Sequence, residues 1–189
     1  MKRYQAFSPD SEMTGTAVLS FTRNILYDEI ETILKRHKLD NIDPAAWYPI
    51  QSMLDVMSDI ADEDNASQNF VSLGIKAAQL LYDAAPESFK KMPFDQFMMN
   101  YSSMYPTRFR NGDAGWADVE KIDANHYLLK VRTPFPDDTV YGAIYGYTKL
   151  LRPPDTSFTV KYDPDLLRRD NGGEYTAIHI TLQPVAPKA

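Results

Sequence analysis

The stretch WADVEKIDANHYLLKVRTPFPDD, residues 116–138, decides the fold class. Apolar and polar residues alternate along residues 126–133, with Tyr127, Leu129 and Val131 on one side, and this period of two is typical of a strand with one solvated face. Residues 123–125, Asp-Ala-Asn, form a turn between this strand and another predicted over 116–123. Because the join is too short for a parallel crossover, we expect an antiparallel hairpin.

The residues after the hairpin predict one more helix and two more strands. The helix opens after Pro134 and Pro136, with two acids in its first turn, and runs to about Leu151. Two further alternating strands are predicted around 158–162 and 176–182, and the turn at 171–173, Asn-Gly-Gly, precedes the last one.

Apolar residues at helical spacing dominate the first hundred positions. The predicted helices are a first one capped by Thr14 or Thr16 and running to about His37, a second from Asp43-Pro44, a third over about 66–84 and a fourth from Pro93. The order is therefore four helices, two strands, one helix and two strands. It predicts an α+β fold with a mainly antiparallel sheet packed against helices. A single domain is expected over 13–183, with flexible tails at 1–12 and 184–189.

Composition and charge exclude several classes of protein. The 189 residues include no cysteine, which removes disulfide frameworks, thiolate zinc sites, iron–sulfur clusters and thiol nucleophiles. The net charge is −6, and residues 1–64 carry twelve acidic against six basic side chains, which argues against binding to nucleic acid. Neither a secretory signal nor a membrane span is recognisable, so we expect a cytoplasmic protein.

The three histidines are the only imidazoles available for acid–base work or metal binding. His37 lies in Lys-Arg-His-Lys at the end of the first predicted helix, which favours a solvated helix cap. His126 and His179 lie on strands, where they face solvent or a sheet edge, or else meet across the sheet as a two-histidine site. No spacing typical of a helical metal site, a nucleophile elbow or a phosphate-binding glycine loop is present.

Three glycines fall inside predicted helices. Gly74 weakens its helix by about 1 kcal/mol relative to alanine, so close approach of another backbone is the expected compensation. Gly142 and Gly146 lie one turn apart on one helix face and form a groove. A helix, a strand or a flat ligand could approach this groove, and packing against the sheet is the simpler alternative.

Aromatic and methionine side chains are numerous enough to line a small-molecule pocket between helices and sheet, although the same residues describe an ordinary core. The candidate lining residues are Trp47, Phe94, Phe97, Met98, Tyr101, Tyr127, Tyr141 and Tyr145. Arg108, Arg110 and Arg132 are candidates for pairing with an acidic headgroup, the alternative being solvated side chains.

The order of elements over 73–182 and the run RRDNGGEYTAIHI, residues 168–180, resemble bacterial domains of the vinyl-reductase type. Their superfamily also includes haem nitric-oxide/oxygen sensors and the TRAPP vesicle-tethering subunits. The resemblance implies a cysteine after the Gly-Gly turn, where this chain has Thr176. The haem sensors' Tyr-x-Ser-x-Arg triad is approached at Tyr105, but Phe109 stands where the arginine is needed. Since no histidine falls in a predicted core helix either, no haem is expected.

Together these features predict a haem-free, metal-free small-molecule-binding or sensory domain, with an apolar and aromatic pocket and no cofactor. One alternative is a protein-interaction or dimerisation module, which predicts an exposed apolar face on the first two helices. The other is a reductase of a tetrapyrrole vinyl group, for which no reductant site is recognisable. A homodimer is compatible with the first two of these functions.

Overall fold

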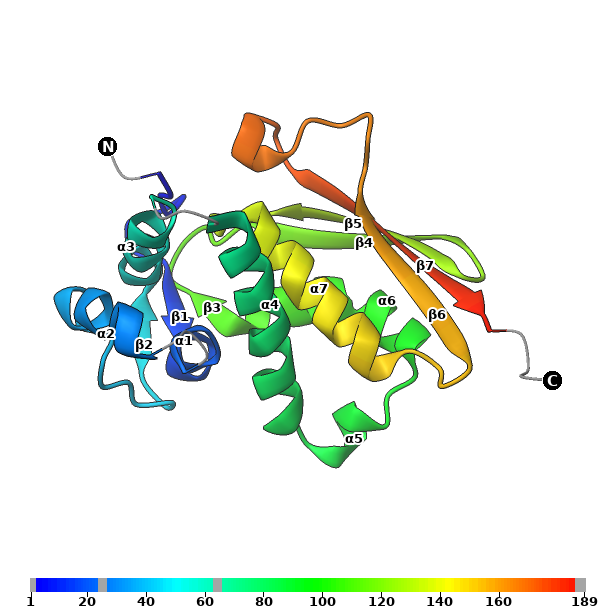
Figure 1. The fold of residues 1–189 in the computed structure, drawn as a ribbon, viewed down its shortest axis with the longest axis horizontal. Helices are drawn as coiled ribbons and strands as arrows, with labels where there is room; N and C mark the ends of the chain where they lie inside the picture. Colours follow the sequence, from blue (N-terminus) through cyan, green and yellow to red (C-terminus); the bar gives the residue numbers. More distant parts are fainter. Residues whose placement is uncertain (1–2, 24–26, 63–65, 186–189) are drawn as a thin grey trace.

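The centre of the fold is a four-stranded antiparallel sheet (Figure 1). The computed structural model describes residues 3–23, 27–62 and 66–185, with the backbone alone for 27–30. The strands are β4 (Trp116–Asp123), β5 (His126–Arg132), β6 (Thr156–Tyr162) and β7 (Thr176–Pro184), in the order β4-β5-β7-β6. Every neighbouring pair is antiparallel, which confirms the prediction of a mainly antiparallel sheet.

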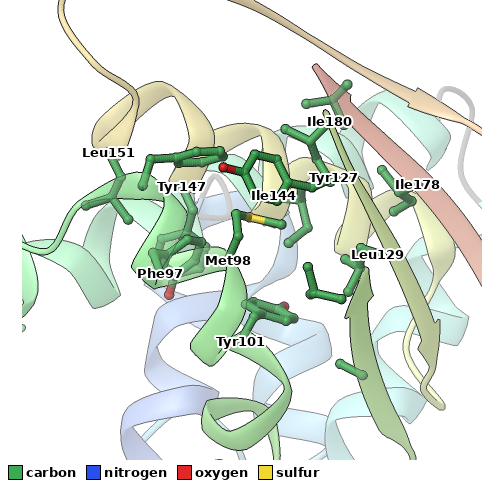
Figure 2. Packing of buried hydrophobic residues seen from close by; sticks show 14 of the residues in the cluster. Phe97, Met98, Tyr101, Tyr127, Leu129, Ile144, Tyr147, Leu151, Ile178 and Ile180 are labelled. Atoms are coloured by element: carbon green, nitrogen blue, oxygen red, sulfur yellow. The ribbon is translucent and has the colours of Figure 1, made fainter. Parts of the chain in front are cut away.

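Helices cover one face of this sheet. They are α6 (Phe94–Met104) and α7 (Asp137–Leu151), and α4 (Ala66–Asp83) packs on α7 (Figure 1). Figure 2 shows Phe97 and Met98 of α6 and Tyr147 of α7 meeting inward residues of the strands. Tyr127 and Leu129 face this core while His126 and Lys130 alternate with them, which confirms the predicted period of two.

The N-terminal half builds a second, smaller core around a three-stranded sheet of order β2-β1-β3. The strands are β1 (Glu12–Thr14), β2 (Trp47–Pro49) and β3 (Phe109–Arg110), and the helices are α1 (Gly15–Thr22), α2 (Tyr27–Arg36) and α3 (Ile50–Ile60). The short α5 (Glu87–Lys90) and the 3-10 turns η1 (Tyr105–Arg108) and η2 (Arg169–Asn171) complete the fold.

Two helix predictions need correction. The first predicted helix is two helices, α1 and α2, and residues 24–26 between them lie outside the described residues. The second helix starts at Ile50 rather than at Asp43-Pro44, because Trp47–Pro49 pairs with β1 as a strand. The Thr14 cap is confirmed, since its side chain accepts a hydrogen bond from the Ala17 amide at 3.3 Å.

The glycines explain how α4 and α7 pack so closely. A Cβ at Gly74 would lie 2.1 Å from the Thr139 carbonyl oxygen, and a Cβ at Gly142 would lie 2.1 Å from the Val71 carbonyl oxygen. Each helix therefore presents bare backbone to the other. The close approach expected at Gly74 is confirmed, and the groove at Gly142 and Gly146 is occupied by α4.

The segment before β1 is packed, although the sequence predicts a tail there. Tyr4 is 4% exposed, and its amide donates to the Ser58 hydroxyl at 3.1 Å. Two guanidinium groups lie over the Phe7 ring, with the Cζ atoms of Arg132 and Arg169 at 3.8 and 4.8 Å from the ring centroid. In the part of the chain that the structure describes, no helix is long and apolar enough to cross a membrane.

Candidate functional site

A partly open cavity of about 60 Å³ lies where the two cores meet. We call it the interhelical cavity, because α1, α4, α6 and α7 surround it together with η1, β3 and the start of the turn before α7. Its lining residues are mostly apolar: Met13, Ala17, Ser20, Phe21, Leu81, Tyr101, Tyr105, Arg108, Phe109, Thr133, Phe135, Thr139, Val140 and Ala143. A mostly apolar lining with a few polar groups is typical of small-molecule sites.

One charged group lines this cavity, the guanidinium of Arg108. Its position at the end of η1 is fixed by the 3-10 turn that follows α6. It donates a hydrogen bond to the Tyr147 hydroxyl at 3.3 Å, and no carboxylate of the described residues pairs with it. Burial lowers the pKa of Arg108, but the surrounding phenols of Tyr147 and Tyr101 raise it further, so the group stays charged.

Hydroxyl groups supply the remaining polarity of the lining. Thr139 is 2% exposed, and its Oγ1 has no hydrogen-bond partner among the described residues. Burial raises the pKa of Tyr101 to about 12, which keeps its phenol protonated. The Tyr105 hydroxyl, by contrast, donates to the Ala114 carbonyl at 3.0 Å and lies 2.8 Å from Thr133 Oγ1.

The residues proposed from sequence separate into those at the cavity and those elsewhere. Tyr101 and Arg108 line it. Four more belong to the core between helices and sheet: Phe94, Phe97, Met98 and Tyr127. Tyr141 and Tyr145 lie against Tyr162 and Phe158 of β6 instead.

Trp47 and two arginines lie away from the cavity. Trp47 is on β2, where the guanidinium of Arg110 covers its ring at 4.5 Å. Arg110 and Arg132 each have a carboxylate partner, Glu12 at 2.6 Å and Asp113 at 2.9 Å. Neither arginine is therefore left with an unmatched charge.

Of the fourteen lining residues, sequence reasoning proposed only Tyr101 and Arg108, and among those it missed, Thr139 is the one with an unpartnered buried polar atom. A threonine inside a helix ordinarily returns its hydroxyl to a carbonyl of the preceding turn, as Thr148 does to Ile144 at 2.8 Å. Nothing in the sequence distinguishes these two threonines. The difference exists only in three dimensions, where Thr139 Oγ1 is buried without a partner among the described residues.

The histidines form a second polar cluster on the face of the sheet away from the helices. His126 Nε2 lies 2.8 Å from His179 Nδ1, and His179 Nε2 lies 3.0 Å from Asp163 Oδ2. The two-histidine meeting that the sequence allowed is thus present, but the two facing nitrogens form a hydrogen bond with each other. Among the described residues no group of three or more histidine and acidic side chains is placed to hold a metal ion.

His37 corrects the expectation of a solvated cap. Its side chain is 12% exposed, and Nε2 lies 2.8 Å from Asp59 Oδ2. Asp59 belongs to α3, so this hydrogen bond connects the end of α2 to α3.

Thr176 holds the loop before β7 on the start of α7. Its hydroxyl donates to Asp137 Oδ1 at 2.5 Å and accepts from the Arg169 amide at 2.9 Å. Asp137 and Asp170 each accept a hydrogen bond from the other's backbone amide, at 2.9 and 2.8 Å. The position at which the resemblance implies a cysteine therefore carries a structural hydrogen-bond network.

Comparison with known proteins identifies the fold from solved structures, but the sequence matches no family. No family model matches the chain, and no curated protein matches it significantly. Solved structures do match. An oxygen-binding H-NOX domain related to soluble guanylate cyclases has a TM-score of 0.70 at 13% identity, covering 93% of this chain and 96% of that one.

Two further H-NOX structures agree. An H-NOX protein from S. oneidensis in the Fe(II) ligation state has a TM-score of 0.71 at 13% identity, with 93% and 98% of the two chains covered. A single-residue mutant of T. Tengcongensis H-NOX has a TM-score of 0.68 at 14% identity, covering 91% and 97%. These structures give no support to the vinyl-reductase or TRAPP part of the resemblance. On this structural similarity, the chain has the α+β fold of the H-NOX domains.

Proposed function

We propose that this chain is a small-molecule-binding or sensory domain whose ligand occupies the interhelical cavity without haem. The observation that carries the proposal is the cavity itself, a space lined mostly by apolar side chains and also by the polar residues Arg108 and Thr139. Such a lining allows apolar contact over most of a ligand and orientation by a few polar groups. The H-NOX fold supports this, because one of the similar H-NOX structures is an oxygen complex.

Haem is the group that the fold family implies, and the residues of this cavity do not fit it. One of the similar structures belongs to a protein that modulates its haem redox potential by distorting the porphyrin. Here the cavity measures about 60 Å³, less than half the size of an engineered cavity of roughly 150 Å³ that binds benzene. A porphyrin is many times larger than benzene, so it would have to displace packed side chains.

The donor set of the cavity leads to the same conclusion. Haem iron in proteins is held by histidine, thiolate, tyrosinate or a methionine–histidine pair. The lining contains no imidazole and no thiol, and it has a single thioether, that of Met13. The pKa values of Tyr101 and Tyr105 are raised by burial, which disfavours the phenolate that would bind iron.

The described residues of α1 and α3 show no exposed apolar face of the kind that an interaction module predicts. That alternative predicts an apolar face on the first two helices. The large apolar side chains exposed within the described residues are scattered elsewhere: Met99, Trp116, Ile122, Leu166, Leu167 and Val185. Single exposed apolar residues of this kind are normal on a protein surface.

Xenon tests the proposed site, because it fills small apolar cavities without needing a polar partner. We expect xenon to shift the NMR signals of Ala17, Val140 and Ala143, and to do so much less in Ala143→Leu, which fills the space. Lys149→Leu on the exposed side of α7 is the matched control and should respond like the wild type. If xenon leaves the lining signals unchanged, or if Ala143→Leu responds like the control, the cavity is not the site.

A further inference from the structure

Resting on the proposed function, we propose that the ligand class of the interhelical cavity is a small monovalent anion, held by the Arg108 guanidinium and by the hydroxyls of Thr139 and Tyr101. The proposal rests on two features of this cavity. One is the positive charge of Arg108, which no carboxylate of the described residues compensates, and the other is the set of hydroxyl groups in the lining.

The charge of Arg108 is the first observation. Arg110, Arg132 and Arg168 each have a carboxylate within 3.1 Å: Glu12, Asp113 and Asp138. Among the described residues, Arg108 has only a neutral partner, the Tyr147 hydroxyl. A cation beside apolar walls loses hydration, and an opposite charge is the compensation that proteins ordinarily supply. A negatively charged ligand would supply it here.

The hydroxyls of the lining are the second observation. Thr139 Oγ1 is buried without a partner among the described residues. Tyr101 brings a second hydroxyl-bearing side chain to the lining, and burial raises its pKa, which keeps the phenol protonated. A buried hydroxyl without a partner costs about 1–3 kcal/mol. Arg108, Tyr101 and Thr139 line one space whose lining contains no carboxylate. An arrangement dominated by donors favours a ligand dominated by acceptors.

The size of the cavity sets the size of the anion. At about 60 Å³, the space is less than half the size of an engineered cavity of roughly 150 Å³ that binds benzene. Water would satisfy the hydroxyls but would leave the charge of Arg108 uncompensated. An anion of a few heavy atoms, such as formate or nitrate, matches both the volume and the charge.

The test compares formate with formamide on the full-length protein. The two probes share shape, but formamide has no charge and carries N–H donors. We expect formate and nitrate to shift the NMR signals of Arg108 and Thr139 in a saturable way, with at least tenfold weaker binding of formamide. Equal shifts from formate and formamide would overturn the proposal, and so would the absence of saturable binding by either anion.

Variants identify the groups that bind. We expect Arg108→Gln to weaken formate binding at least tenfold and the nearly isosteric Thr139→Val to weaken it several-fold, while Arg110→Gln, at an arginine already paired with Glu12, leaves it unchanged. Wild-type affinity in Arg108→Gln would contradict the assignment. If Arg108→Gln does not fold, the formate and formamide comparison on the wild type still decides.

Xenon binding distinguishes failure of the anion proposal from failure of the proposed small-molecule site. Binding of xenon without binding of formate would leave a small-molecule cavity and remove the anion. If neither binds, the cavity itself fails as a site.

Discussion

The Arg108 guanidinium donates to the Tyr147 hydroxyl across 3.3 Å, and this contact ties the end of η1 to the middle of α7. Tyr147 is 2% exposed and packs its ring against Phe97 at a centroid distance of 5.1 Å. The orientation of the one charged group in the cavity is therefore set by an aromatic residue of the main core. A ligand that binds Arg108 would therefore alter the contact of Arg108 with Tyr147, and with it the environment of α7.

Tyr147→Phe should separate the packing of this ring from its hydrogen bond. The ring stays in place, so we expect the free energy of unfolding to fall by only about 1 kcal/mol, the usual contribution of one hydrogen bond. Arg108 loses the acceptor that orients it, so formate affinity should fall several-fold. Denaturant unfolding and NMR titration measure the two effects. Unchanged formate affinity would show that Tyr147 does not position Arg108.

The crossing of α4 and α7 should tolerate no added methyl group at its centre. Gly74→Ala and Gly142→Ala each place a Cβ about 2.1 Å from a backbone carbonyl oxygen, so the helices must separate. We expect each to lower the free energy of unfolding by about 3 kcal/mol, the upper part of the range for overpacking.

Two other positions control for this effect. At Gly146 the nearest atom to an added Cβ is the Ala78 Cβ at 2.8 Å, so Gly146→Ala should cost less. Gln79→Ala on the exposed side of α4 should change stability by less than about 0.5 kcal/mol. Equal losses at Gly74 and Gln79 would contradict the contact.

Asp170 should make the fold less stable as the pH rises. Burial, and next the neighbouring Asp137 carboxylate, raise the pKa of Asp170 to about 6. Because the folded protein holds this proton more tightly than the unfolded chain, stability is lost between about pH 4 and pH 6 as the proton leaves. Asp170→Asn keeps an oxygen for the Asp137 amide and removes the charge.

We therefore expect Asp170→Asn to stabilise the protein by about 2 kcal/mol at pH 8 and by little at pH 4. Chemical denaturation at both pH values gives the difference. A variant that is destabilised equally at the two pH values would show that the carboxylate is needed for more than its acceptor oxygen.

The histidine cluster should have one defined set of tautomers. Asp163 accepts from His179 Nε2, which leaves His179 Nδ1 as an acceptor for His126 Nε2. We expect long-range proton–nitrogen NMR at neutral pH to find the proton of each neutral ring on Nε2. The hydrogen bond from His179 also lowers the pKa of Asp163. The stabilisation that this carboxylate gives is thus present above the usual pKa of an aspartate and is lost as the pH falls through the lowered value.

Asp163→Asn is the control for the cluster. It removes the carboxylate that fixes the His179 ring, so mixed tautomers should appear. A proton found on His179 Nδ1 in the wild type would contradict the arrangement.

Periodicity was sufficient to predict the sheet, because β5 alternates strictly between buried and half-buried residues and β7 does so from Ile178 to Leu182. Periodicity was insufficient to predict β2, because a strand of three residues is too short to show an alternating pattern. Trp47 also fits the helical spacing of the residues that follow it. Gly74 pointed correctly to a backbone contact, because glycine inside a helix needs a reason. The cavity could not be foreseen, because its lining comes from segments between Met13 and Ala143, and sequence patterns do not report which side chains fail to fill a space.

The central claim is that this chain uses the H-NOX fold to bind a small ligand without haem, and native mass spectrometry of protein produced in haem-supplemented cells tests it most directly. We predict the mass of the bare chain, or of the chain with a small molecule that Arg108→Gln no longer retains, and no Soret absorbance after gel filtration. One haem per chain, with a Soret band that survives gel filtration, would contradict the claim.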